Sequence, residues 1–219
     1  MFLKSLLFVL LMLATSLQAD YITVYDMDGN TQTFMYHDIN HAKVINKSGR
    51  ESSSVYRIDK KIYLVSKKHG RTEVIDMDEM KKMMSSLGSK EQIKRDKKES
   101  MPKYSIKKTG KRVTVAGIKG EVWIVSGKEE GESFKETVVV TKDKRVVKTE
   151  HAKMKLFLMM GDSEEDAQNI FEIEKGYVTI KADGMILKSF KEKDLPKSEY
   201  KLPKDIKINK ATDMLKSFF

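Results

Sequence analysis

The sequence predicts a mainly β protein in which two or three helices interrupt antiparallel strands. Turn-forming pairs that end in glycine recur at short intervals, from Asp28-Gly29 to Asp183-Gly184. The segments between these turns are rich in β-branched and aromatic residues, and polar and apolar residues alternate in segments such as 177–181. This spacing is typical of antiparallel hairpins, and the alternation predicts strands with one buried and one wet face.

The first 19 residues have the order of a secretory signal peptide. Lys4 precedes an apolar run at 6–14, and Ala19 stands just before the polar Asp20. The apolar run is shorter than the roughly 20 residues that a membrane-spanning helix needs, so cleavage after Ala19 is a better interpretation than a retained anchor. We therefore expect a mature chain of residues 20–219 that is soluble in the periplasm.

Eleven short segments between the turns are predicted to be strands that pair as hairpins. They cover residues 21–25, 31–36, 42–45, 54–58, 61–66, 72–75, 111–115, 121–125, 135–141, 177–181 and 185–190.

Helical spacing of apolar residues predicts the helices. In residues 77–87 one stripe consists of Met77, Met80, Met83, Met84 and Leu87. This helix is expected to lie on the sheet. A second helix is predicted over 150–160, which is nearly all apolar from Met154 onwards and is followed by Gly161. Ser163 and Asp166 indicate the capping box of a third helix, so the acidic cluster 162–166 is interpreted as a helix start instead of a calcium site.

Residues 88–102 are predicted to form a polar connector, because they are mostly Lys, Glu, Ser, Arg and Asp. Neither half of the chain offers a complete closed sheet, so residues 20–219 are predicted to form a single domain. The chain contains no cysteine. Disulfides, thiol catalysis, zinc–thiolate sites and iron–sulfur clusters are therefore excluded, and stability must come from packing.

The formal net charge of +10 comes mainly from lysine, since only six of the 42 basic residues are arginine. Nucleic-acid readers favour arginine, whereas lysine is a strongly hydrated point charge that suits a solvated surface. We expect no nucleic-acid partner. A weak association with an anionic membrane surface fits the charge better.

No motif of the chain predicts catalysis, a cofactor or a metal site. It has neither a glycine-rich phosphate loop that opens a helix nor a Gly-x-Ser-x-Gly elbow. Residues 26–30 resemble a calcium loop superficially, but the glycine comes too early and no glutamate closes the loop. The sequence therefore predicts a protein that is not an enzyme.

Three fragments resemble a family of exported bacterial proteins whose architecture is related to the outer-membrane lipoprotein carriers (Lol-type). The main fragment is KKTGKRVTVAGIKGEVWIV at 107–125, which is similar to the pattern GKKTVAGYKCEKYEV. The others are VIDMDEM at 74–80 and LPKSEYKLP at 195–203. The resemblance implies a curved antiparallel half-barrel with helices across its concave side. The family often has cysteine where this chain has Gly120, so a thiol role at that position is absent here.

If such a carrier holds an apolar ligand, its lining should be apolar and deformable. Methionine is flexible and polarizable, so a methionine-rich surface can fit lipid or lipoprotein acyl chains of different shapes. The predicted ligand-binding residues are Met80, Met83, Met84, Trp123, Phe157 and Met160. The alternative interpretation of the same stripes is ordinary core packing.

Two other functions remain open at this point. Methionine thioethers also select copper(I), and the methionines of 77–84 together with His37 and His41 suggest a copper-binding envelope protein. The two histidines would form a metal pair only on a helix, which the flanking β pattern disfavours. The third possibility is a structural or interaction protein of the envelope without a small ligand, whose protein partner the sequence does not identify.

Overall fold

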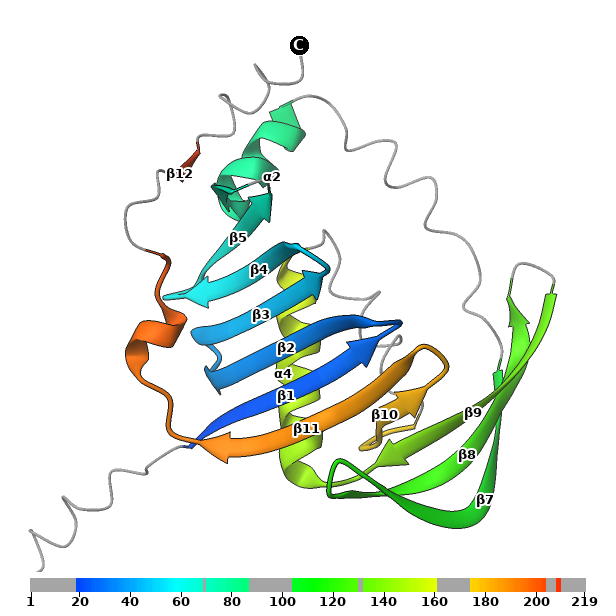
Figure 1. The fold of residues 1–219 in the computed structure, drawn as a ribbon. Helices are drawn as coiled ribbons and strands as arrows, with labels where there is room; N and C mark the ends of the chain where they lie inside the picture. Colours follow the sequence, from blue (N-terminus) through cyan, green and yellow to red (C-terminus); the bar gives the residue numbers. More distant parts are fainter. Residues whose placement is uncertain are drawn as a thin grey trace, which may run out of the picture.

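The protein folds into one open, curved sheet with helices on its concave side. The structure, a computed structural model, describes residues 19–68, 70–86, 104–129, 132–160, 174–203 and 208–209. Twelve strands form the sheet, accompanied by two α-helices and a short 3-10 helix (Figure 1). Eleven strands pair antiparallel, and β12 runs parallel to β6. The predicted fold class is thereby confirmed.

The strands form three runs along the chain, β1–β6, β7–β9 and β10–β11, followed by the short strand β12. They are β1 (Asp20–Met27), β2 (Asn30–Asp38), β3 (His41–Ser48), β4 (Glu51–Ile58), β5 (Lys61–Lys68), β6 (Arg71–Asp76), β7 (Tyr104–Val115), β8 (Ile118–Glu129), β9 (Glu132–Thr141), β10 (Val178–Ala182), β11 (Met185–Lys193) and β12 (Ile208–Asn209). Their order in the sheet is β12-β6-β5-β4-β3-β2-β1-β11-β10-β9-β8-β7. The first strand therefore lies in the middle of the sheet, between β2 and β11.

Both α-helices pack on the concave side. Helix α4 (Lys144–Met160) crosses β1, β2, β3 and β10, whereas α2 (Met77–Ser86) follows β6 directly and packs beside β5 and β6. The helices meet at the C-terminal end of α4, where Lys81 Nζ donates a hydrogen bond of 2.7 Å to the Met159 carbonyl oxygen.

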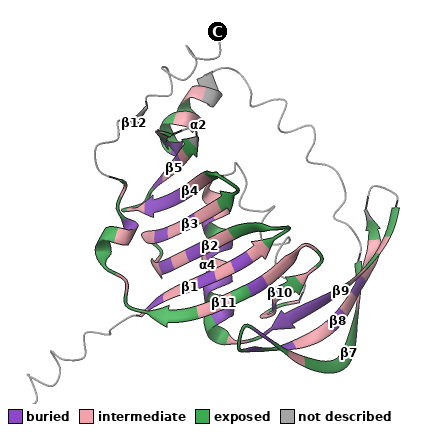
Figure 2. Cartoon of the chain, viewed as in Figure 1, coloured by how far each residue is buried: buried purple, intermediate pink, exposed green. Residues whose placement is uncertain are grey.

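Helix α4 covers two apolar clusters that lie side by side on the sheet. Val146, near its start, is buried with Ile180 and Leu187 of β10 and β11. Leu156, near its end, is buried with Phe34 of β2 and with other residues of β2–β5. Figure 2 shows that buried positions recur along α4 and along the strands behind which it runs. Each large apolar side chain contributes about 1.5–3 kcal/mol to stability when it is buried. Since α4 buries such side chains in both clusters, it holds the two parts of the sheet together.

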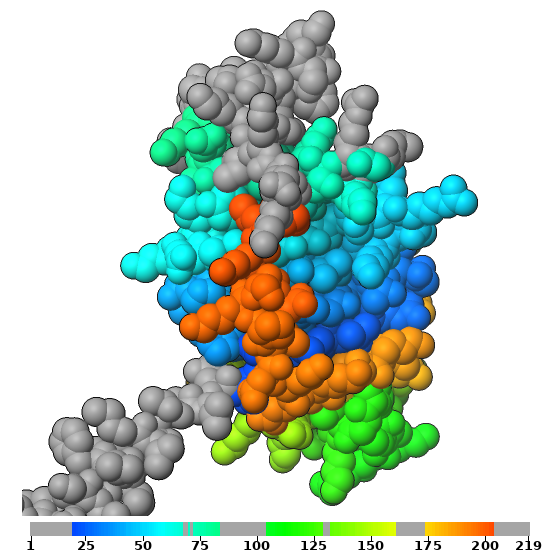
Figure 3. Space-filling model, turned by 60° about the vertical axis from the view of Figure 1, so that its left-hand side comes forward, coloured from blue at the N-terminus to red at the C-terminus, as the bar shows by residue number. Residues whose placement is uncertain are grey.

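The C-terminal segment covers part of the opposite side. The 3-10 helix η2 (Lys197–Tyr200) lies against β3 and β4 (Figure 3). Leu202 packs against the cluster of Tyr56, Val65 and Val74, which points away from α4.

The predicted strands and the first two predicted helices are present, and the largest differences concern β7, β8, α4 and β12. Strands β7 and β8 are longer than the predicted 111–115 and 121–125, because their polar outer halves continue the pairing. Helix α4 starts at Lys144, six residues before the prediction. The two-residue strand β12 was not predicted.

Several predictions lie outside the described residues: the signal segment up to residue 18, the connector 88–102, and the third helix with the acidic cluster 162–166. Among the helices that the structure describes, none is long and apolar enough to cross a membrane.

Candidate functional site

The concave side of β2–β5 is organised in three cross-strand rows, because neighbouring strands pair in register and every second side chain points to the same side. The apolar row consists of Phe34, Val44, Val55 and Leu64. The arginine row, nearer to the β2–β3 turn, consists of Tyr36, Ala42, Arg57 and Ile62. The polar row, nearer to the β1–β2 turn, consists of Gln32, Asn46, Ser53 and Ser66.

The helices place a half-buried apolar layer above the apolar row. Met80 of α2 and Phe157, Met159 and Met160 of α4 are partly buried hydrophobic residues that pack against the cluster around Phe34. Unbranched methionine side chains adapt to neighbours of different shapes, so this layer is more deformable than one built from leucine or valine.

Arg57 brings a positive charge into this apolar region. The residue is only 8% exposed. Its Nη1 contacts the sulfur of Met159, and its Nε is buried without a hydrogen-bond partner. Burial lowers the pKa of the Arg57 guanidinium below its usual value, while the charge of Asp38 opposes the shift. A thioether is a weak acceptor, so the guanidinium is poorly satisfied.

No carboxylate in the described part of the chain lies within ion-pair distance of Arg57. Asp38, whose charge acts on Arg57 from farther away, accepts hydrogen bonds from the Asn40 backbone N–H and from His41 at 2.7 and 3.0 Å. Leaving a buried charge without a close partner costs several kcal/mol. An anion beside Arg57 would offset that cost.

The structure brings together three of the six residues predicted to bind an apolar ligand. Met80, Phe157 and Met160 belong to the layer described above. Met83 lies on the same helix as Met80 and is half-buried, whereas the side chain of Met84 lies outside the described residues.

Trp123 lies apart from these residues, on the other side of the sheet. It is fully buried, its ring lies tilted against that of Tyr177 with centroids 4.7 Å apart, and Lys108 Nζ lies 4.8 Å from its ring centroid. Its neighbour Val122 faces the α4 side, and successive residues of a strand point to opposite sides. Trp123 is therefore not part of the site that the helices cover.

A cavity of about 510 Å³ opens over the polar row. Its lining comes from β1–β5 and includes all four members of the polar row. Neither this cavity nor a role for Arg57 was predicted from the sequence. The signal for both was present in the alternation of β4, where positions 53 and 57 carry polar side chains on the side that Val55 marks as buried.

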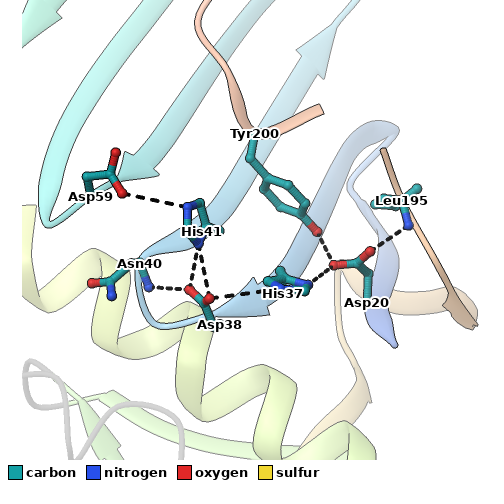
Figure 4. Close-up of polar contacts among 8 residues, drawn as sticks. All are labelled: Asp20, His37, Asp38, Asn40, His41, Asp59, Leu195 and Tyr200. Atoms are coloured by element: carbon teal, nitrogen blue, oxygen red, sulfur yellow. Dashed lines mark hydrogen bonds and ion pairs between the residues drawn. The ribbon is translucent and has the colours of Figure 1, made fainter. Parts of the chain in front are cut away.

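A second polar cluster lies at the β2–β3 turn and joins the ends of the described chain (Figure 4). The carboxylate of Asp20, almost fully buried, accepts hydrogen bonds from Tyr200 Oη at 2.9 Å and from the Leu195 backbone N–H at 2.5 Å, and it lies 2.8 Å from His37 Nδ1. Burial and the hydrogen bond to Asp20 raise the pKa of Tyr200 well above its usual value. Through these hydrogen bonds to Asp20 of β1, the cluster holds η2 against the middle of the sheet.

The histidines of this cluster lie among carboxylates instead of beside the methionine stripe. His41 Nδ1 lies 3.0 Å from Asp38 and its Nε2 lies 3.7 Å from Asp59. In the described part of the chain, no group of three or more His, Asp and Glu side chains is arranged to hold a metal ion.

Comparisons with known proteins find no match to this chain among protein-family models, curated proteins or solved structures.

Proposed function

We propose that the protein is a non-enzymatic, carrier-like binding protein that acts in the periplasm after export and holds an anionic acyl ligand on the concave side of its sheet. The acyl chain would lie between the sheet and the helices, against Met80, Phe157 and Met160. Its carboxylate or phosphate would pair with Arg57.

The buried guanidinium of Arg57 carries this proposal. It lies at the border of a deformable apolar layer, and within the described residues its contacts are a sulfur atom and weaker, more distant charges. Hydrogen bonds between charged partners contribute about 1.5–3 kcal/mol each, which corresponds to a preference of about tenfold to a hundredfold for an anion over a neutral analogue.

The open sheet supports the same function. An apolar ligand needs a surface whose covering side chains can move, and the methionine-rich ends of α2 and α4 provide one. The resemblance to exported carrier-like proteins, stated above for residues 107–125, points in the same direction.

The first experiment is native mass spectrometry of the mature protein purified from its own cells, followed by organic extraction of whatever is bound. A stoichiometric acylated molecule supports the proposal. A protein that carries nothing and binds no added acyl probe contradicts it.

The second experiment compares cis-parinaric acid, a fluorescent fatty acid, with its neutral methyl ester. The wild-type protein should bind the acid about tenfold or more tightly than the ester, and Arg57→Met should abolish that preference while leaving ester binding intact. Arg50→Met is the matched control, because it removes the same charge from an exposed turn residue. Equal affinities for acid and ester in the wild-type protein would rule out Arg57 as the anion site.

A further inference from the structure

The cavity over the polar row differs chemically from the rest of the concave side. From one cross-strand row of β2–β5 to the next, the side chains change from apolar to polar. The apolar row is Phe34, Val44, Val55 and Leu64, and the polar row is Gln32, Asn46, Ser53 and Ser66. Two residues along a strand correspond to about 7 Å, so the polar row that lines the cavity lies directly beside the apolar row.

The polar row is unusual for its position. A sheet side that is covered by helices normally continues with apolar residues, and serine is a poor strand former compared with β-branched residues. Here β4 carries the run Ser52-Ser53-Ser54, and all four members of the polar row are neutral and polar while being half-buried. Departures from local rules of this kind are typical of functional sites.

The row keeps much of its hydrogen-bonding capacity available. Gln32 Nε2 donates to Asn46 Oδ1 at 3.1 Å, which leaves the Gln32 oxygen and the Asn46 amino group facing other partners. Within the described part of the chain, the hydroxyls of Ser53 and Ser66 form no side-chain hydrogen bond. Amides and hydroxyls both donate and accept, so they match ligands whose groups do the same.

The charge of the lining indicates a neutral ligand. Lys47 and Glu51 bring one charge of each sign to the cavity, and Arg57 belongs to a different row. A cavity of about 510 Å³ falls in the size range of small-molecule sites.

We propose that this cavity binds a neutral, polyhydroxylated ligand, namely a saccharide or polyol, through the amides of Gln32 and Asn46 and the hydroxyls of Ser53 and Ser66. The site is separate from Arg57, and binding of a free saccharide there does not depend on the acyl-binding function. The ligand is either a free saccharide or the sugar of a glycolipid whose acyl chain reaches the adjoining apolar layer.

Chemical-shift titration of the isotope-labelled mature protein tests the proposal. The probes are glucose, galactose, N-acetylglucosamine and glycerol, each free and, for the sugars, as the octyl glycoside. We expect saturable shifts at residues of β2–β5 that line the cavity. Binding of the free probes identifies a free saccharide or polyol as the ligand, and binding of the octyl glycosides alone identifies a glycolipid.

Two variants and one control make the assignment specific. Asn46→Leu and Ser53→Ala should each weaken binding by about tenfold, because each removes hydrogen bonds to the ligand. Ser54→Ala, the same substitution on the opposite side of the same strand, should leave binding unchanged. Absence of saturable binding for every probe, or binding that Asn46→Leu and Ser53→Ala leave intact, would overturn the proposal whether or not fatty acids bind at Arg57.

Discussion

Gly120 shows how a single residue fits the packing of this sheet. Its backbone is ordinary for a strand, so conformational freedom does not explain the glycine. The available space does. A Cβ atom at this position would lie 2.5 Å from Val139 Cγ1 and 3.2 Å from Ile180 Cδ1. The side chains of β9 and β10 therefore fill the volume that a larger residue would need at this position.

Gly120→Ala should destabilise the protein by about 1–3 kcal/mol, because the added methyl group overpacks the core. Urea unfolding of the purified variant measures the loss. In a background of Val139→Ala the same substitution should cost less, since the closest conflicting atom is gone and only the Val140 carbonyl oxygen at 3.0 Å and Ile180 Cδ1 at 3.2 Å remain close. Equal costs in both backgrounds would show that the close approach to Val139 is not the cause.

At the scale of single elements, Asp143 determines where α4 begins. Its Oδ1 accepts a hydrogen bond of 3.0 Å from the Arg145 backbone N–H, and the Arg145 guanidinium donates to both carboxylate oxygens at 3.1 and 2.8 Å. The hydrogen bond from the Arg145 side chain is the main cause that lowers the pKa of Asp143, and burial opposes it. This is an N-cap reinforced by an ion pair.

Asp143→Ala should cost about 1 kcal/mol of stability at neutral pH. Because folding lowers the pKa of Asp143 from an unfolded value of about 3.9, its contribution is fully present above that value and is lost as the pH falls through the folded pKa. The difference in unfolding free energy between wild type and variant should therefore shrink in acid, as urea curves at several pH values would show.

The matched control for this prediction is Asp194→Ala, which removes an exposed carboxylate that makes no capping hydrogen bond to the nearby helix η2. Its effect should be small at every pH. A difference for Asp143→Ala that stays constant down to strongly acidic pH would contradict the role of the charged cap.

The early start of α4 also explains a limit of sequence reasoning at this scale. The turn-forming residues Lys142–Lys144 and the β-branched residues that follow favour a turn and a strand, not a helix. Burial of Val146 against β10 and β11 stabilises the helical conformation instead. That contact joins parts of the chain that are far apart in sequence, so it cannot be read from the local sequence. The strands themselves were predictable because alternation and turns are local signals.

The candidate site was predictable only in part, for the same reason. Helical spacing identified Met80, Phe157 and Met160, since the stripe of a helix can be read from sequence. Arg57 and the polar row have meaning only once the register of β2–β5 places them next to one another. Trp123 looked like a partner of the methionines because aromatic character alone does not reveal the side of the sheet.

At the scale of the whole molecule, α4 should make the sheet unfold as one unit. The cluster around Val146 involves β1, β7–β11 and the start of α4, and the cluster around Leu156 involves β2–β5 and the end of α4. We expect the fluorescence of Trp123 in β8 and hydrogen exchange of amides in β2–β4 to report the same free energy of unfolding.

The variant Leu156→Ala tests this cooperativity more strictly, because it weakens only the cluster of β2–β5. It should lower the stability by about 2–5 kcal/mol, because the residue is almost fully buried. Both probes should shift together, although Trp123 lies far from the substituted residue. Two separate transitions, with only β2–β4 affected, would divide the molecule into two independent units.

The central place of β1 has a consequence for the order in which the molecule assembles. β1 comes first among the described strands, yet one of its two neighbours, β11, comes almost last. A chain that is synthesised, or threaded through a narrow channel, from its N-terminus presents β1 long before β11 exists. Closing so long a loop is slow, and pairing across it must wait for the last part of the chain. The pairing of β1 with β11 can therefore form only once nearly all of the described chain is available, and until then β1 lacks one of its two neighbours.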